Sequence, residues 1–323
     1  MTMVPQQTAQ SRIITVGGGK GGVGKSIVAL NLAAALAQDG YRVVIADMDL
    51  GSANQHILLG VRSPAAGLQA LLDKSVDEAK SCLTETQVPN LRLLAGTSGV
   101  LGAANITGDQ KTLLLRKLRA LEADIIVVDV GAGVGYDMLD FFDLGVLKLI
   151  VTTPQVTALH DAYAFLKSAA LRLFSHIAEE DIDAALLEPA TLSTGGQKVV
   201  EKLAHLRETR PELAAKVFSE LERFGACIVG NQVFKDADSL VFGAVARTIH
   251  DYLGLNVPVL GWLRTSAAVH ESVNGRRPLV LDKTTKDSAA FHSLARKLLA
   301  TLPAADLDLG IVEDVAIDEP SAA

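Results

Sequence analysis

The sequence predicts an α/β protein built on a doubly wound, mainly parallel sheet with helices on both faces. Short β-branched runs alternate along the chain with longer helical segments, which is the pattern of repeated βαβ units. Of the 323 residues, 49% are hydrophobic but only 4% are aromatic, so the core is expected to consist of Ala, Val, Leu and Ile. A chain of this length forms one large domain or two ordinary ones.

The elements follow one another in the order that such a sheet requires. Residues 13–16 are the first β-branched run, and a glycine-rich turn leads into an Ala- and Leu-rich helix over Lys25–Gln38 that Asp39-Gly40 ends. Six later runs are expected to be strands: 43–45, 91–95, 125–128, 147–151, 227–229 and 259–262. Ligands of such folds bind at the carboxyl ends of strands, where Asp47, Asp129 and Asn231 stand.

One stretch interrupts the alternation. About fifty residues separate the helix expected at 161–173 from the strand at 227–229, whereas connections usually take about 2–6 residues. Segments 197–208 and 211–224 have apolar residues at helical spacing, so we interpret region 179–224 as a helical insertion. Ordinary crossover helices that have become longer are the alternative.

We expect a single domain over residues 12–303 between a flexible N-terminus (1–11) and an acidic, disordered tail (304–323). The tail has six acidic residues and no Lys or Arg, so most of the net charge of −7 belongs to it. The amphipathic segment 288–302 before the tail either packs on the domain or docks elsewhere.

Charge, cysteines and hydropathy exclude several classes of protein. A net charge of −7 argues against a surface that binds nucleic acid or anionic lipid throughout, but allows a local basic patch. Cys82 and Cys227 lack a CxxC partner, which excludes disulfide scaffolds, zinc ribbons and cysteine-ligated iron–sulfur clusters. No signal peptide and no apolar stretch of roughly 18 residues is present, so we expect a soluble cytoplasmic protein.

The most specific motif is Gly-Lys-Gly-Gly-Val-Gly-Lys-Ser at residues 19–26, which fits G-x-x-x-x-G-K-[ST] between a strand and a helix. Its glycines let backbone N–H groups converge on phosphate oxygens at the positive end of the helix. Lys25 would neutralise β- and γ-phosphates and Ser26 would coordinate Mg²⁺. A glycine-rich hairpin turn is the alternative. The residues expected to bind nucleotide here are Gly19, Lys20, Gly21, Gly22, Val23, Gly24, Lys25, Ser26 and Ile27.

Three carboxylates follow predicted strands. Asp47 and Asp49 leave the second strand, where an anion near the γ-phosphate can hold waters of Mg²⁺ or orient an attacking water. A strand-end turn or a helix cap made by Asp is the alternative. Four apolar residues precede Asp129, which is the Walker B pattern and is weak by itself. The small residues 130–133 after it suit a loop that responds to the γ-phosphate.

A second loop lysine, Lys20, is within reach of the phosphates, unless it is simply solvated. With it, residues 20–26 match K-G-G-x-G-K-[ST], and the sequence resembles the deviant Walker A ATPases of the MinD/ParA family. The resemblance implies a homodimer that encloses ATP, in which Lys20 reaches the partner's phosphates and stabilises the transition state. It also implies that Asp47 supports the metal and Asp49 positions the attacking water. We therefore expect Lys20, Lys25 and Asp49 to be catalytic, and Ser26, Asp47 and Asp129 to hold Mg²⁺.

Further segments resemble the FlhG/FleN branch, the MinD-like regulators of flagellar number and placement: 47–60 (DMDLGSANQHILLG), 128–133 (VDVGAG) and 152–167 (TTPQVTALHDAYAFLK). Asn231 stands where family members hydrogen-bond adenine, and residues 261–280 resemble the family's closing stretch. The resemblance covers residues 12–297 apart from the insertion. It implies a protein partner that is a flagellar or polar-positioning component and that activates hydrolysis or recruits the protein to a pole or membrane.

Departures from the family pattern limit what the resemblance implies. Ile27 replaces a threonine that contacts the α-phosphate, His56 an aspartate, Gln155 a glutamate, and Arg264 and Ser266 the Pro and Asp of the adenine loop. Phosphate binding is therefore better supported than a preference for ATP. The branch's N-terminal activator motif and its basic C-terminal membrane helix have no counterpart in this sequence.

The sequence thus favours a Mg·ATP-dependent homodimerising switch that slow hydrolysis resets. One alternative is a ParA-like partition factor that binds DNA non-specifically, although Arg264, Arg276 and Arg277 form no dense basic run. Another is an ATP-dependent metabolic or metallocentre-maturation enzyme. A scaffold with an inactive site conflicts with the complete motif. His56 and His160 are expected at a surface or interface, because phosphoryl transfer in this architecture depends on positioning and charge.

Overall fold

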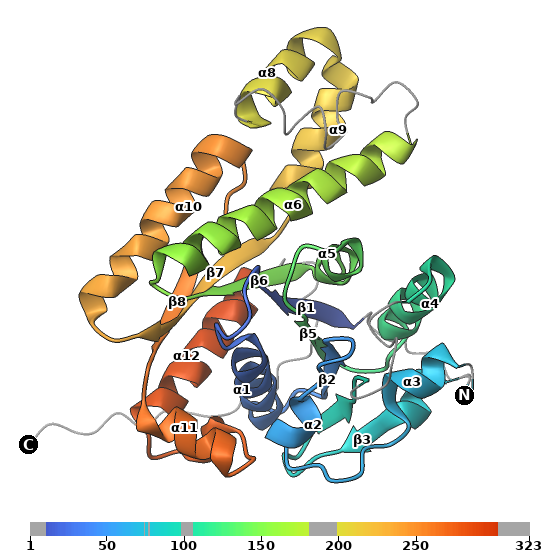
Figure 1. Cartoon of the computed structure of the whole chain (residues 1–323), viewed down its shortest axis with the longest axis vertical. Helices are drawn as coiled ribbons and strands as arrows, with labels where there is room; N and C mark the ends of the chain where they lie inside the picture. Colours follow the sequence, from blue (N-terminus) through green and yellow to red (C-terminus); the bar gives the residue numbers. More distant parts are fainter. Residues whose placement is uncertain (1–10, 74, 77, 98–105, 181–198, 303–323) are drawn as a thin grey trace, which may run out of the picture.

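The computed structural model describes residues 11–73, 75–76, 78–97, 106–180 and 199–302, and within them it contains one sheet of eight strands (Figure 1). The strand order is β3-β4-β2-β5-β1-β6-β7-β8. The parallel strands are β1 (Arg12–Gly17), β2 (Val43–Met48), β4 (Leu91–Leu94), β5 (Ile125–Val130), β6 (Leu147–Thr152), β7 (Ala226–Val233) and β8 (Val259–Arg264). The predicted fold class is confirmed.

The edge strand β3 (Leu83–Glu85) was not expected from the sequence. It pairs antiparallel with β4 and has only three residues, none of them fully buried. So short and half-exposed a segment lacks the apolar run that identified the other strands.

Helices cover both faces of the sheet, and successive residues of each strand alternate between the two layers. Ile13 faces the core that includes α4 (Gly108–Arg119), α5 (Tyr136–Asp143), α6 (Val156–Glu180) and α10 (Leu240–Leu253). Ile14 faces the core that includes α1 (Lys25–Gln38) and α12 (Lys286–Thr301). The remaining α-helices of the described chain are α2 (Gln55–Leu58), α3 (Gly67–Leu72), α8 (Val199–Thr209), α9 (Pro211–Glu222) and α11 (Ala267–Asn274).

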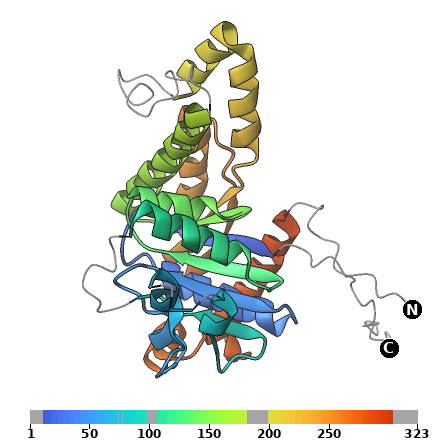
Figure 2. The same cartoon turned by 90° about the vertical axis from the view of Figure 1, so that its right-hand side faces the viewer.

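A helical arm projects from one end of the molecule (Figures 1 and 2). The second half of α6 extends beyond the sheet, and α8 and α9 pack there through buried side chains that include Leu203, Leu206 and Val217. These two helices lie where helical spacing predicted them, and Pro211 begins α9 at a position where its missing N–H costs nothing. Reading region 179–224 as an insertion in one domain stays an interpretation, since residues 181–198, 1–10 and 303–323 lie outside the described part.

The amphipathic segment near the C-terminus packs on the domain. Its helix, α12, buries Phe291, Leu294 and Leu298 in the core shared with α1. This decides between the two alternatives that the sequence left open. Within the described residues, no helix has the length and hydropathy needed to cross a membrane.

The topology places the candidate ligand-binding residues at one edge of the sheet, where the parallel strands have their carboxyl ends. From β1 the chain passes through α1 to β2 on one side, and from β6 it passes through α6 to β7 on the other side. Such a reversal opens a crevice at the carboxyl ends of the strands, where ligands of doubly wound sheets bind. The glycine-rich loop after β1 lies at this edge.

Candidate functional site

The glycine-rich loop joins β1 to α1, and its conformation requires glycine at specific positions. Gly24 has φ +92°, in the left-handed region, and a Cβ there would overlap the side-chain amide of Asn231. A Cβ on Gly19 would overlap the carbonyl of Asp161. The loop therefore passes close to β7 and α6, and α1 begins directly after it at Lys25, so its free N–H groups face the loop.

Lys25 is buried at the base of this loop, with 8% of its surface exposed. Its Nζ donates to the carbonyl of Lys20 at 3.2 Å. Burial lowers the pKa of the ammonium, while the nearby carboxylates of Asp129 and Asp49 act in the opposite direction. A desolvated cation held toward the loop is suited to bind phosphate oxygens.

Lys20 lies on the outside of the loop. Within this single chain its Nζ donates to Thr157 Oγ1 at 2.8 Å, in the first turn of α6. The contact holds Lys20 at the loop's outer surface, and the expected role across a dimer stays a prediction.

Asp47 and Asp129 lie side by side, because β2 and β5 pair with these two residues in register. Both are almost fully buried. Burial raises the pKa of Asp129 to about 7, with repulsion from Asp47 as the next cause, and burial likewise raises the pKa of Asp47 to about 6. Two buried carboxylates at paired positions of adjacent strands repel each other. This repulsion favours a cation between or beside them or, without a cation, a proton on one of them.

Asp47 also organises the loop that follows β2. Its carboxylate accepts hydrogen bonds from the backbone N–H groups of Asn54 (2.8 Å), Gln55 (2.9 Å) and Asp49 (3.3 Å). The residue thus makes the strand-end turn that the sequence offered as the alternative to metal binding. Because it also lies beside Asp129, Asp47 can both stabilise this turn and contribute to a metal site.

Asp49 is half-buried and faces the phosphate loop from the end of β2. Burial raises the pKa of its carboxyl, and the nearby Lys25 opposes this shift. The loop after β5 comes close, since a Cβ on Gly131 would lie 3.1 Å from Asp49 Oδ1. The expected role of Asp49 in positioning an attacking water stays a prediction.

Gln55 is a site residue that the sequence analysis missed. Its side chain is completely buried, and its Nε2 donates to Asp129 Oδ2 at 2.8 Å and to the Ser26 carbonyl at 3.0 Å. Asp129 also accepts a hydrogen bond from the Ser26 side chain. The sequence around it, Ser-Ala-Asn-Gln-His at residues 52–56, is largely polar and gave no signal that this side chain is buried.

Asn231 and Gln232 hold the loop from the end of β7. Asn231 Nδ2 donates to the Val23 carbonyl at 2.8 Å, and Gln232 Nε2 donates to the Gly22 carbonyl at 2.9 Å. Gln232 has φ +54°, a left-handed conformation in which a non-glycine residue is uncommon. The sequence predicted Asn231 but gave no reason to select Gln232.

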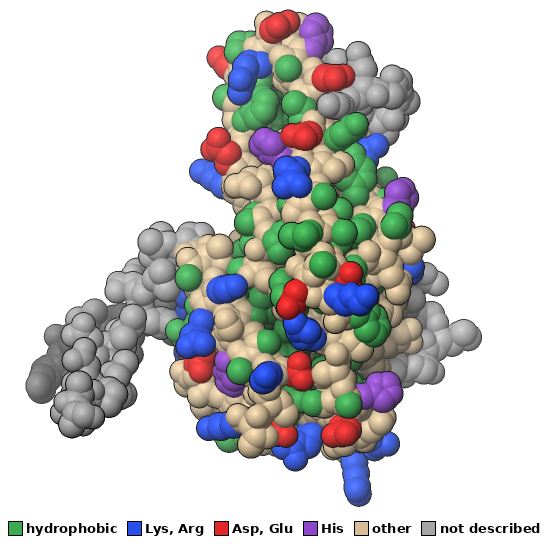
Figure 3. Space-filling view, turned by 90° about the vertical axis from the view of Figure 1, so that its left-hand side faces the viewer, with side chains coloured by type: hydrophobic (Ala, Val, Ile, Leu, Met, Phe, Trp, Pro, Cys, Tyr) green, Lys and Arg blue, Asp and Glu red, His purple; other side chains and the backbone are tan. Residues whose placement is uncertain are grey.

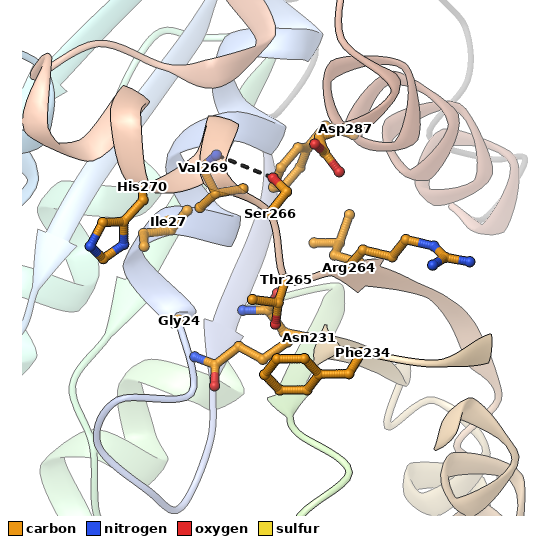
Figure 4. A pocket seen from close by; sticks show the side chains of 13 residues that line it. Gly24, Ile27, Asn231, Phe234, Arg264, Thr265, Ser266, Val269, His270 and Asp287 are labelled. Carbon is orange, nitrogen blue, oxygen red and sulfur yellow. Dashed lines mark hydrogen bonds between the residues drawn. The ribbon is translucent and has the colours of Figure 1, made fainter. Parts of the chain in front are cut away.

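A cavity of about 230 Å³ opens beside the loop, between the ends of β7 and β8 and the start of α11 (Figure 4). Ile27 and Asn231 line it, together with Thr265, Ser266 and His270. Arg264 lies at its edge and is bonded to Asp236. The predicted nucleotide residues from β1 and from β7 are therefore brought together around one space.

The side chains at this edge fit magnesium and a nucleotide phosphate. Mg²⁺ usually keeps several waters and takes one or two carboxylates plus phosphate oxygens, rather than a full set of protein ligands. In the described residues, no three His, Cys, Asp or Glu side chains are gathered as a metal cluster. Ser26, Asp129 and Asp47 are thus the residues that would hold the ion. His160, which is exposed beside Asp161, lies outside this set.

Comparison with known protein families shows the family to which this chain belongs. The family model described as the CobQ/CobB/MinD/ParA nucleotide binding domain matches residues 14–279, which is most of the chain. The chain belongs to the CobQ/CobB/MinD/ParA family. The predicted resemblance to MinD/ParA proteins is confirmed, and members of this family related to MinD and ParA are ATPases.

Individual relatives carry two kinds of name. The chain is 38% identical over 161 residues to the flagellum site-determining protein YlxH of Helicobacter pylori. The aligned region covers 49% of this chain and 53% of that protein. The chain is 30% identical over 290 residues to the putative septum site-determining protein MinD of Oltmannsiellopsis viridis, which covers 89% of this chain and 75% of that protein. The match therefore spans only about half the length of the flagellar relative.

Solved structures share the fold. MinD of Pyrococcus horikoshii, a septum site-determining protein complexed with Mg-ADP, superposes with a TM-score of 0.63 at 21% identity, covering 93% of this chain and 100% of that one. This likeness supports the architecture of the MinD/ParA-related sheet.

Proposed function

We propose that this protein is a Mg·ATP-dependent switch that dimerises around its nucleotide and resets by slow hydrolysis. The observation that carries the proposal is the phosphate loop itself, with two lysines and with Asp47, Asp49 and Asp129 at the same edge of the sheet. The family provides the reaction class, and the MinD relative complexed with Mg-ADP supports the pair of ligands.

Each of these side chains has its own role in phosphoryl transfer. Bound Mg²⁺ would offset negative charge on the phosphates. The loop N–H groups and Lys25 bind the β- and γ-phosphates, while Ser26, Asp129 and Asp47 would hold the ion. Asp49 orients the attacking water. Catalysis of this kind depends on positioning and charge, so no histidine base is required.

The cavity beside the loop supports an adenine base. Asn231 Nδ2 is occupied by the Val23 carbonyl, which leaves its Oδ1 as a hydrogen-bond acceptor at the cavity. An acceptor there pairs with the exocyclic amino group of adenine and repels the carbonyl oxygen of guanine. Ile27 offers the base an apolar contact in place of a hydroxyl.

Exposed apolar side chains around the same edge support a homodimer. Val134, Val156 and Phe234 lie within four residues of the ends of β5, β6 and β7 and are 50%, 82% and 72% exposed, and Leu240, the first residue of α10, is 76% exposed. Large apolar side chains exposed together mark an interaction surface. A second copy facing this edge would cover them and would bring its own Lys20 toward the phosphates. The MinC:MinD complex of Aquifex aeolicus illustrates that a relative also works with a protein partner.

We propose that the protein partner on which this switch acts is a flagellar or polar-positioning component. The names of relatives support it, since one is a flagellum site-determining protein and others are septum site-determining proteins. Both names describe placement of a structure in the cell. The protein would act in the cytoplasm and reach a pole or membrane through that partner.

A second candidate, non-specific DNA binding in the ATP-bound state, has one observation in its favour. Between residues 264 and 297 the chain has seven exposed basic residues, Arg264, Arg276, Arg277, Lys283, Lys286, Arg296 and Lys297, against three acidic ones. On the face that Figure 3 presents, Lys and Arg side chains are spread over the lower part, with acidic side chains between them. ATP-dependent retention of mixed-sequence DNA that falls steeply with salt would support this candidate.

Phosphate release measured with Mg·ATP tests the proposed activity. The wild type should release phosphate slowly, Lys25→Ala should bind no nucleotide, and Asp49→Ala should bind ATP without hydrolysing it. A wild-type protein that binds neither ATP nor ADP would contradict the proposal.

A further inference from the structure

The buried amide of Gln55 connects three parts of the candidate site. Its Nε2 bridges the Ser26 carbonyl at 3.0 Å and Asp129 Oδ2 at 2.8 Å, and its backbone N–H donates to Asp47 Oδ2 at 2.9 Å. One residue at the start of α2 thus contacts the end of the phosphate loop and both buried strand-end acids. None of this side chain is exposed.

The other atom of this amide, Oε1, is buried and has no hydrogen-bond partner among the described residues. Two more buried oxygens nearby, the Asn54 amide Oδ1 and the Thr97 hydroxyl Oγ1, also have no hydrogen-bond partner in the described part of the chain. Asn54 donates its backbone N–H to Asp47, and Gly96, which precedes Thr97, lies directly against Asp47. Buried polar atoms are usually paired, by protein or by ordered water, so these unpartnered oxygens indicate a hydrogen-bond partner that the described residues do not supply.

The orientation of the Gln55 amide is determined by its partners. Exchanging its nitrogen and oxygen would place Oε1 against the Ser26 carbonyl and the Asp129 carboxylate, which are both acceptors. The observed orientation instead gives both acceptors an N–H. Oε1 is therefore fixed as a free acceptor one amide width from a carboxylate that would hold the metal.

We propose that Gln55 is a positioning residue of the magnesium site. Through Nε2 it ties Asp129 to the phosphate loop, and through Oε1 it accepts a hydrogen bond from the water that surrounds the ion. The inference rests on the proposed function, because it concerns Mg²⁺ bound with a nucleotide. Mg²⁺ retains several waters that need acceptors, and groups behind the metal ligands typically contribute about 10–100-fold to metal affinity.

The test measures how Mg²⁺ strengthens the binding of a fluorescent ADP analogue, by titrating the cation and recording its half-maximal concentration. Gln55→Met keeps the side-chain length but removes both hydrogen-bonding atoms. It should raise the half-maximal Mg²⁺ concentration by about 10–100-fold. Binding of the analogue in EDTA should change little, since the loop glycines and Lys25 remain.

Gln69→Met is the matched control. Gln69, on α3, also donates through Nε2 to a carboxylate, Asp73 at 2.9 Å, and also has a buried Oε1 without a partner in the described structure. It lies outside the nucleotide site. The control should leave the half-maximal Mg²⁺ concentration unchanged.

The outcomes separate this inference from the proposed function. If wild type binds the analogue with Mg²⁺ dependence and Gln55→Met retains the wild-type half-maximal concentration, the inference is wrong while the proposed function stands. If wild type binds no analogue at all, the proposed function fails. Should Gln55→Met not fold, Gln55→Asn serves, since its shorter amide cannot span both partners and should show the same loss. An unchanged Mg²⁺ dependence in Gln55→Asn would equally overturn the inference.

Discussion

Replacing Asp129 by Asn should stabilise the protein in the absence of metal and nucleotide, although it removes a site residue. The reason is electrostatic. Burial and the neighbouring Asp47 raise the pKa of Asp129 to about 7 from an ordinary value of 3.8. An acidic group whose pKa is higher in the folded protein than in the unfolded chain makes its full contribution to stability at pH values below the unfolded pKa. This contribution is lost as the pH rises through the folded pKa.

The magnitude follows from the same shift. At about 1.4 kcal/mol per pKa unit, keeping Asp129 in the folded protein becomes about 3 kcal/mol more costly between pH 5 and pH 8, and the cost levels off once the pH exceeds the folded pKa. Asn has no such cost at any pH. It can still accept the hydrogen bond from Gln55 Nε2 and can pair with the adaptable hydroxyl of Ser26.

Thermal unfolding in EDTA at pH 5 and pH 8 provides the assay. The melting temperature of Asp129→Asn relative to wild type should be higher at pH 8 than at pH 5 by about 6 °C, at about 2 °C per kcal/mol for a chain of this size. Saturating Mg·ATP should reverse the order, because wild type alone gains the full stabilisation by ligand.

Asp47→Asn is the internal contrast. The pKa of Asp47 is also raised, to about 6, but its carboxylate accepts three backbone N–H groups, and an Asn would direct its NH₂ at one or more of them. This variant should be less stable than wild type at both pH values. An Asp129→Asn protein whose advantage is the same at pH 5 and pH 8, or that is destabilised at pH 8, would refute the reasoning.

Other variants test the loop and the core. Lys20→Ala should keep nucleotide affinity but lose about 10³-fold in phosphate release, the lower end for a charge supplied in trans, and normal turnover would exclude that role. Gly24→Ala should lower the free energy of unfolding by at least about 1–2 kcal/mol because of its positive φ and its overlap with Asn231, which denaturant titration measures. Asn231→Ala should weaken ADP binding about 10-fold in calorimetry, since the loop loses a hydrogen bond and the base an acceptor. Leu298→Ala should cost about 2–5 kcal/mol in the same titration if α12 belongs to the core, and an unaffected midpoint would show that it does not.

The local parts of the site could be predicted from the sequence. The helix at Lys25–Gln38 has the bounds that the motif and the Asp39-Gly40 stop indicated, and the strand expected at 13–16 extends by one residue at each end, to Arg12–Gly17. Each signal lies within a few residues of what it determines. The ends of α6 were less well determined, since the expected helix at 161–173 runs in fact from Val156 to Glu180. Its second half is stabilised by packing in the arm rather than by its own sequence pattern.

The parts that depend on distant contacts could not be predicted. The pairing of Asp47 with Asp129 depends on the register between β2 and β5, and the contacts of Asn231 and Gln232 join residues about 210 positions apart. Gln55 gave no sequence signal of burial, because a polar residue in a short helix is usually exposed. Its burial follows from the turn that Asp47 stabilises, which folds α2 back onto the phosphate loop.

The central claim is that ATP closes two copies of this chain around their nucleotides. Size-exclusion chromatography with light scattering on Asp49→Ala, with Mg·ATP, Mg·ADP or neither, tests it most directly, since this variant should hold ATP unhydrolysed. The account predicts a species of twice the 34.0 kDa chain mass with Mg·ATP, and the monomer with Mg·ADP and without nucleotide. A monomer in Mg·ATP, in samples where bound ATP is directly measured, would contradict it.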